Sequence, residues 1–293
     1  MPRRWPYHLL AVIVVLTWGV TFVNSKVLLN HGMQAHEIFF VRFLLAYACI
    51  WLISPHKLWA DNVADELRLV VLGITGGSLY FITENVAVKV GYVNNVSIIV
   101  CTAPLLTTLL ALLVYKDVKA SRPLIFGSLA ATVGVSLVVF NGHIYLKINP
   151  LGDILALSAA LCWATYSLLL RRMSHYNVVF LTRKVFFYGL LTVLPVFLVK
   201  PWSFPLSGLT HPIVAGNLLF LGLIASFTCF ALWSFVSKRL GALTASNYIY
   251  LNPISTMVTS GIVLHEHMTW MASLGSLFIL VGVFLANKGT PKS

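Results

Sequence analysis

The residues of this chain that could do chemistry are the few ionisable side chains inside long apolar runs. Glu84 is the acid that lies well inside such a run, and Tyr80 precedes it by one helical turn. An ionisable group in hydrocarbon is costly and marks a functional site by default. We therefore expect Glu84 to contact a cation or amine, or to carry a proton. The alternative is a structural ion pair with Lys26 or Arg42.

Basic residues inside the runs form a second set of candidates. Arg42 and Arg183 occur at matching depths in their runs. They could contact a substrate carboxylate or, with Lys26, form a gate or charge pair. The alternative is that both arginines snorkel to the membrane boundary or cap carbonyl groups there. Snorkelling is also the expectation for Lys26 and Lys184.

Aromatic and amide side chains deep in the runs could line an amphipathic pocket or could simply fill the core. Aromatic residues near the ends of runs are better explained as interface belts. With Glu84 included, the candidate substrate-binding residues are Trp18, Tyr80, Glu84, Asn85, Trp163, Tyr166, Trp233, Asn247 and Tyr250.

Motifs of several other functional classes are missing from the sequence. There is no P-loop and no glycine-rich dinucleotide motif, so we expect neither ATP hydrolysis nor a cofactor. His265 and His267 lack the i, i+4 spacing of a zinc helix, and no metal site is predicted. A membrane-embedded enzyme would need convergent catalytic groups, whereas the runs contain one acid and no deep histidine. We do not expect an enzyme.

Composition indicates which elements must position these residues. Apolar residues make up 59% of the 293 positions and charged residues 10%, with a mean hydropathy of +0.89. A soluble domain carries roughly 25% charged residues, so the chain is predicted to be an all-α membrane protein. Runs of about 20 apolar residues predict ten transmembrane helices, at 9–29, 36–54, 67–88, 93–114, 122–140, 151–170, 178–199, 215–237, 243–264 and 270–287.

The formal net charge of +12 reflects topology rather than a nucleic-acid partner. With the N-terminus inside, thirteen of the twenty lysines and arginines fall on the inner side of the ten predicted helices. Only Lys89, Lys147 and Lys200 fall on the outer side. This asymmetry follows the positive-inside rule. We therefore expect a multi-pass protein of the cell inner membrane with both termini in the cytoplasm.

The chain also reads as two copies of one unit. The segments 91–139 and 241–286 each start at Gly, place a Pro inside an apolar run and reach an acid, and both continue with Gly-Ser-Leu and Val-Gly-Val. Five predicted helices per copy is an odd number, so the second copy must enter the membrane from the opposite side. The expected organisation is two inverted five-helix repeats, at 1–146 and 147–293. Inverted repeats are typical of transporters that rock around a central site.

Glycines and prolines inside the predicted helices carry further expectations. Gly73 and Gly77 form a G-x-x-x-G pair that allows another helix to approach closely. Pro104 and Pro253 each free a backbone carbonyl one turn earlier. Because that carbonyl needs a partner in lipid, these helices should face the protein interior or a wet cavity.

Together these features resemble the drug/metabolite transporter superfamily, and within it the EamA-type ten-helix transporters. The residues that carry the resemblance are Trp18-Gly19, Trp163-Ala164, Arg42, Arg183, Pro104, Pro253, Asp117, Glu266 and the Gly-Ser-Leu and Val-Gly-Val endings. The resemblance covers nearly the whole chain, with one departure at Asp117, where the usual pattern has Glu. It implies a secondary transporter that moves a small organic metabolite across the inner or plasma membrane by alternating access. It further implies an amino acid or related compound as substrate, and export as direction.

A passive facilitator or channel of the same fold is the alternative to a transporter, and kinetics would separate the two. The expected partners are a small-molecule substrate and the lipid bilayer, without nucleic acid. Substrate identity, proton coupling and the choice between monomer and homodimer do not follow from the sequence.

Overall fold

The computed structural model describes residues 5–53, 58–90, 93–116, 118–119, 121–140, 149–263 and 269–290. Within these ranges the chain is helical and has no strand, so the predicted all-α class is confirmed. Eight helical segments in these ranges are long and apolar enough to cross a membrane, and two of them, Val63–Ala87 and Pro212–Leu240, run through a π-helical stretch.

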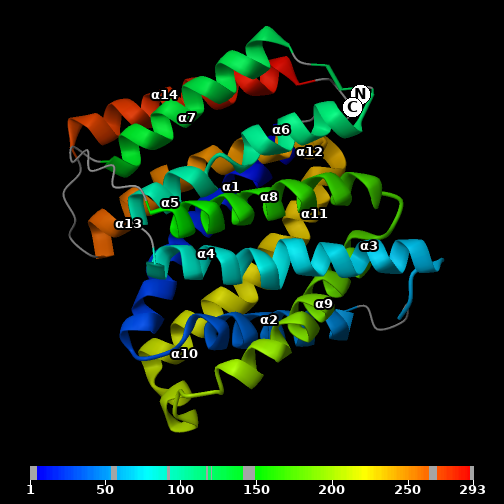
Figure 1. The fold of residues 1–293 in the computed structure, drawn as a ribbon, viewed down its shortest axis with the longest axis vertical. Helices are drawn as coiled ribbons and strands as arrows, with labels where there is room; N and C mark the ends of the chain where they lie inside the picture. The colour runs from blue at the N-terminus through cyan, green and yellow to red at the C-terminus, as the bar shows by residue number, and fades with distance from the viewer. Residues whose placement is uncertain are drawn as a thin grey trace.

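The helices form two series with the same order of features (Figure 1). The first series is α1 (Trp5–Asn30), α2 (Ala35–Ile53), α3 (Val63–Gly73), η1 (Ile74–Ser78), α4 (Leu79–Val90), α5 (Val93–Val100), α6 (Ala103–Val114) and α7 (Arg122–Phe140). The second is α8 (Pro150–Arg172), α9 (Val178–Val199), η2 (Leu206–Thr210), α10 (Pro212–Leu219), η3 (Phe220–Thr228), α11 (Cys229–Leu240), α12 (Ala242–Asn247), η4 (Tyr248–Leu251), α13 (Asn252–Val263) and α14 (Trp270–Gly289). Each series therefore has two long helices, a helix with a π-helical middle, an interrupted helix and a final long helix.

The predicted spans 93–114 and 243–264 are interrupted rather than continuous. The first breaks at a turn over Cys101 and Thr102, and Pro104 stands in the first turn of α6. The second passes through the 3-10 turn η4, and Pro253 stands in the first turn of α13. Proline has no N–H to donate to the preceding turn, and a helix start is where this costs nothing. The count of ten spans consequently stays a prediction, with two of them discontinuous.

The π-helical segments η1 and η3 occupy the same place in the two series. In η1, Gly77 leaves helical geometry, with φ −130° and ψ −109°. A Cβ atom at Gly73 would lie 2.4 Å from the Cβ of Tyr188, and one at Gly77 would lie 3.3 Å from the Cα of Gly189. The close helix approach predicted from Gly73 and Gly77 is confirmed, and the partner is α9.

Helices α7 and α14 pack side by side at one end of the molecule (Figure 1). A Cβ at Gly134 would lie 2.6 Å from the carbonyl oxygen of Gly275, and a Cβ at Gly127 would lie 2.6 Å from that of Gly282. Rising residue numbers in α7 thus meet falling numbers in α14, so the two helices are antiparallel. The repeated Gly-Ser-Leu and Val-Gly-Val segments supply the glycines of this interface.

The contacts between the two series are reciprocal: matching helices of each series pack on matching helices of the other. Helix α1 packs on α11 and α13 of the second series, while α8 packs on α4 and α6 of the first. In the same way α2 packs on η3, and α9 packs on η1. One hydrophobic core runs through both series, with Phe43, Phe186 and Phe230 among its fully buried side chains.

Candidate functional site

A cluster of aromatic rings lies where the first helices of the two series meet. Trp18 of α1 and Trp163 of α8 touch edge to face, with ring centroids 5.4 Å apart. Trp233 of α11 lies 5.2 Å from Trp18, Tyr80 of α4 lies 5.5 Å from Trp163, and Tyr166 of α8 lies 5.3 Å from Trp163. The structure thereby brings together five of the predicted site residues, contributed by four helices and both series.

The three indole N–H groups of this aromatic cluster differ in their partners. Trp18 Nε1 donates to the carbonyl oxygen of Ala225 in η3, at 2.9 Å. Trp163 Nε1 and Trp233 Nε1 are buried without a hydrogen-bond partner in the part of the chain that the structure describes. Buried donors are normally satisfied. The two unpartnered N–H groups are therefore available to a bound acceptor.

Glu84 extends the cluster with a carboxylate. Tyr80 Oη donates to Glu84 Oε1 at 2.9 Å, from one turn earlier on the same helix. No direct ion pair joins Glu84 to Arg42 among the described residues, although the two charges interact at longer range; Arg42 Nε donates to Ser226 Oγ at 2.9 Å. The Arg42 guanidinium lies 5.1 Å from the Phe81 ring centroid. A carboxylate beside ring faces, without an ion pair to Arg42, can receive an ammonium group by charge and by cation–π attraction.

Three other predicted site residues have different neighbours. Asn85 Nδ2 donates to the carbonyl oxygen of Phe81 in its own helix, and Asn247 Nδ2 donates to Asn287 Oδ1 of α14. Tyr250 is fully buried in η4, and no ring contact joins it to the cluster within the described residues. The structure thus does not bring Asn85, Asn247 or Tyr250 to the aromatic cluster.

The described basic candidates are buried in the helix bundle. Arg42 and Arg183 are 4% and 2% exposed, and Arg183 lies over the Phe180 ring at 5.6 Å. Lys184 is 4% exposed and pairs with the Glu66 carboxylate. That Lys184 snorkels stays a prediction, because its ammonium group pairs with Glu66 in the first turn of α3. The side chain of Lys26 lies outside the described residues.

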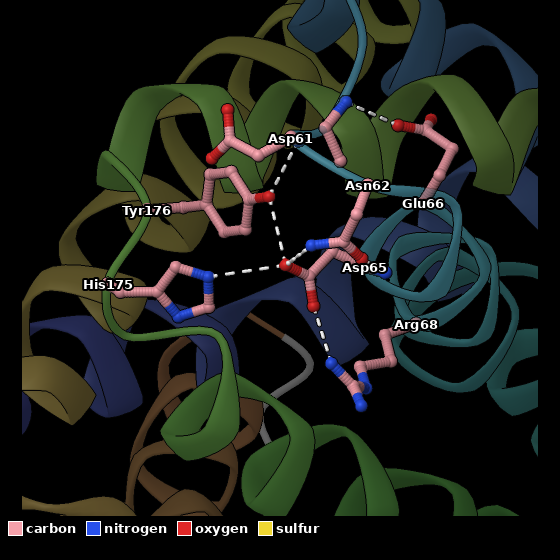
Figure 2. A network of polar contacts seen from close by, with 8 residues as sticks. Asp61, Asn62, Asp65, Glu66, Arg68, His175 and Tyr176 are labelled. Atoms are coloured by element: carbon pink, nitrogen blue, oxygen red, sulfur yellow. Dashed lines mark hydrogen bonds and ion pairs between the residues drawn. The ribbon is translucent and has the colours of Figure 1, made fainter.

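A polar network joins the start of α3 to the α8–α9 connection (Figure 2). Asp65 accepts from Arg68 Nη1 at 2.5 Å, from Asn62 Nδ2 at 2.9 Å and from Tyr176 Oη at 3.0 Å. His175 Nε2 lies 3.4 Å from the same carboxylate. Burial and the neighbouring Asp65 raise the pKa of Tyr176 to about 12, so its hydroxyl stays protonated and donates.

Glu66 carries the next part of this network. Its carboxylate accepts from Lys184 Nζ and Tyr188 Oη of α9, and from the backbone N–H of Ala60 at 2.7 Å. Lys184 Nζ also lies 4.9 Å from the Trp59 ring centroid. Two adjacent acids of the first series are thereby tied to the second series.

A second set of polar contacts between the two series lies at the start of α2. Glu37, fully buried, accepts from the backbone N–H groups of Ser203 and Phe204 at 2.5 and 3.1 Å. Its other oxygen accepts from the backbone N–H of Gln34 at 2.8 Å, as in a capping box. Glu37 thus stands in the first turn of α2, where a carboxylate is favourable.

The Asp65–Glu66 network was missed because the third span was predicted to begin at residue 67. A signal was present: Asn62 caps α3 by accepting from the Asp65 N–H at 2.8 Å. Asn followed three residues later by an acid marks a helix start. Among the described residues, no group of three or more His, Cys, Asp or Glu is placed to hold a metal ion.

Comparison with known families gives two matches to one model. Residues 5–140 and 150–288 each match the model described as the EamA-like transporter family. The chain is also similar in fold to a solved crystal structure, with a TM-score of 0.77, 15% identity and coverage of 97% of each chain.

Three curated relatives span nearly the whole chain. An "Uncharacterized transporter" of Archaeoglobus fulgidus is 25% identical over 96% of this chain and 96% of its own length. A "Probable amino-acid metabolite efflux pump" of Escherichia coli is 22% identical over 94% of this chain and 93% of its own length. A "Probable terminal-alkyne amino-acid exporter" of Streptantibioticus cattleyicolor is 23% identical over 95% of this chain and 92% of its own.

Proposed function

Because the chain belongs to the EamA-like transporter family, we propose that it is a secondary transporter that exports an amino acid or related metabolite by alternating access. The eight helical segments of membrane-spanning length in the described ranges support a multi-pass membrane protein. Together with the family, this points to transport rather than to enzymatic catalysis. We place the protein in the cell inner membrane with both termini in the cytoplasm, on the distribution of lysines and arginines.

The architecture that we propose is two inverted five-helix repeats, with the boundary at residues 146 and 147. Two observations support the inversion. The final helices of the two series, α7 and α14, run antiparallel through their glycines. The contacts of α1 with α11 also have a counterpart in those of α8 with α4. Two halves related in this way can exchange their packings, one open to each side.

We assign the substrate to the aromatic cluster beside Glu84. The observation that carries this assignment is the contact of Trp18 with Trp163, which places matching residues of both halves in one cluster with Tyr80 and Glu84. Because both halves contribute residues to this site, its geometry changes when the halves move relative to each other. Such a site is what alternating access requires.

An amino acid is complementary to the groups that this cluster offers. Its ammonium group would pair with Glu84, flanked by ring faces. Its carboxylate would accept from the buried indole N–H groups of Trp163 and Trp233, which have no partner in the described part of the chain. The printed names of two relatives, an amino-acid metabolite pump and an amino-acid exporter, support this substrate class. Energy would come from the substrate gradient or from protons carried by Glu84.

Ligand-dependent stability and proton-dependent uptake test the proposal. Purified protein is first screened against the proteinogenic amino acids, since a ligand at 100 times its Kd stabilises by about 2.7 kcal/mol. The stabilising amino acid then serves in liposomes with an imposed pH gradient. We expect the gradient to accelerate uptake by the wild type and not by Glu84→Gln. Full proton-dependent uptake by Glu84→Gln would remove Glu84 as the proton carrier.

A further inference from the structure

A crevice lies away from the aromatic cluster, where α1 and α14 flank the α12–η4 segment. It has a volume of about 700 Å³. His8 and Val12 of α1 line one wall, Tyr248 and Leu251 of η4 form the floor, and Phe284 of α14 lies on the other wall. Neither the proposed transport site nor the two sets of polar contacts between the halves use this crevice.

The crevice is polar at one end and apolar at the other. Towards the first turn of α1 and the end of α14 it is lined by His8, Thr244, Asn287, Lys288 and Thr290. These groups are ordered: His8 Nδ1 and Tyr248 Oη are 2.6 Å apart, and the hydroxyls of Thr244 and Thr290 are 2.9 Å apart. About one or two turns deeper, the lining residues of α1, η4 and α14 are apolar: Val12, Leu251 and Phe284. A molecule that fits needs a polar head at the membrane surface and an apolar chain below it.

The apolar part of the crevice opens at the perimeter of the helix bundle. Leu280 and Phe284 of α14 are 54% and 59% exposed, whereas Val283 and Leu251, farther in, are each 6% exposed. Because the perimeter of a membrane-spanning bundle faces lipid, the bilayer has direct access to this opening.

The polar end of the crevice carries positive charge. The Lys288 ammonium group lies 4.5 Å from the Phe284 ring centroid, at the junction of the polar and apolar parts. Arg239 lies 5.7 Å from the ring centroid of Tyr7, the neighbour of His8. None of the described residues that line the crevice is acidic. Lysine beside polar hydrogen-bonding groups between helices suits a phosphate head group.

We propose that this crevice binds one anionic phospholipid from the leaflet on the side of the chain termini. The phosphate lies at Lys288 and Asn287, and an acyl chain lies along Val12, Leu251 and Phe284. Since η4 forms the floor, the lipid touches the discontinuous segment that precedes α13. This lipid site goes beyond the proposed transport function and does not depend on it.

Counting bound lipid by native mass spectrometry tests the site without any transport measurement. Dioleoylphosphatidylglycerol and dioleoylphosphatidylcholine, which share their acyl chains, are titrated separately onto the purified full-length protein. We expect one phosphatidylglycerol per chain at concentrations where phosphatidylcholine is not retained. Lys288→Ala should weaken this binding about fivefold, the effect of one basic residue at an anionic membrane surface. Val12→Trp, which fills the apolar end, should abolish the single-lipid species.

The matched control is Lys119→Ala, which removes the same charge from an exposed lysine outside the crevice. It should bind phosphatidylglycerol as the wild type does. Equal retention of the two lipids by the wild type would overturn the proposal. So would equal weakening by Lys288→Ala and Lys119→Ala, because charge alone and not the crevice would then govern retention.

Discussion

The indole rings of Trp18 and Trp163 meet at right angles, with centroids 5.4 Å apart, although they belong to opposite halves of the chain. Both residues occupy the first helix of their half, yet their N–H groups differ. Trp18 Nε1 is bonded to Ala225, whereas Trp163 Nε1 has no partner among the described residues. Under the proposed function, Trp18 has a structural role and Trp163 a binding role within one cluster.

Replacing each tryptophan by phenylalanine should separate these roles. Trp163→Phe keeps a ring but removes the unpartnered N–H, so we expect KM for the transported amino acid to rise about tenfold, the value of one hydrogen bond to a charged group. Trp18→Phe should instead lower the free energy of unfolding by about 1 kcal/mol or more, because it leaves the Ala225 carbonyl unsatisfied. Uptake kinetics and thermal unfolding measure the two effects.

The matched control for both variants is Trp270→Phe, since Trp270 is 78% exposed at the start of α14. It should change neither KM nor stability. An unchanged KM in Trp163→Phe, measured with functional protein, would contradict a role for its N–H in binding.

Removing one partner of the Glu66–Lys184 pair should destabilise the protein strongly. The two side chains are 15% and 5% exposed, so either one alone would leave a buried charge, at a cost of about 3 kcal/mol. Glu66→Gln and Lys184→Met should each lower the thermal unfolding midpoint. The double variant should cost clearly less than the sum of the two. Lys119→Ala serves as control, because Lys119 is exposed and an exposed charge contributes little to stability. Strict additivity of Glu66→Gln and Lys184→Met would show that the pair is not coupled.

Adding a methyl group at a glycine of the α7–α14 interface should destabilise the protein. Gly134→Ala places a Cβ 2.6 Å from the Gly275 carbonyl oxygen, so the helices must separate at a cost of about 1–3 kcal/mol. Gly216→Ala is the matched control, because no atom lies within 4 Å of its new Cβ. Helix propensity should make that control neutral or stabilising. Equal unfolding midpoints for the two variants would rule out this close packing.

Local sequence patterns predict much of the aromatic cluster. Trp18, Tyr80, Trp163 and Trp233 stand out as large or polar exceptions deep in apolar runs, and the structure brings their side chains together. Tyr250 is predicted for the same site because it too is an aromatic residue deep in an apolar run. The 3-10 turn η4 has about three residues per turn instead of 3.6. A residue inside such a turn does not keep the helical face that its place in the run suggests, so depth alone does not place Tyr250 at the cluster.

Pairings between distant segments do not follow from the sequence. Lys184 and Glu66 are 118 residues apart, and no local pattern in either helix selects the other. The same holds for Glu37, whose carboxylate accepts hydrogen bonds from the backbone N–H groups of Ser203 and Phe204. Helix starts are easier to predict from sequence than such long-range pairs, because the Asn62–Asp65 spacing marks the first turn of α3.

Counterflow tests alternating access around the central site most directly. Liposomes that contain the protein are preloaded with the stabilising amino acid unlabelled, and the same compound is then added outside at trace level with an isotopic label. A transporter exchanges the two, so the label should accumulate transiently inside above its outside concentration, and this overshoot should fall in Trp163→Phe but not in Trp270→Phe. A label that only equilibrates, without overshoot and without saturation, would indicate a pore and contradict the account.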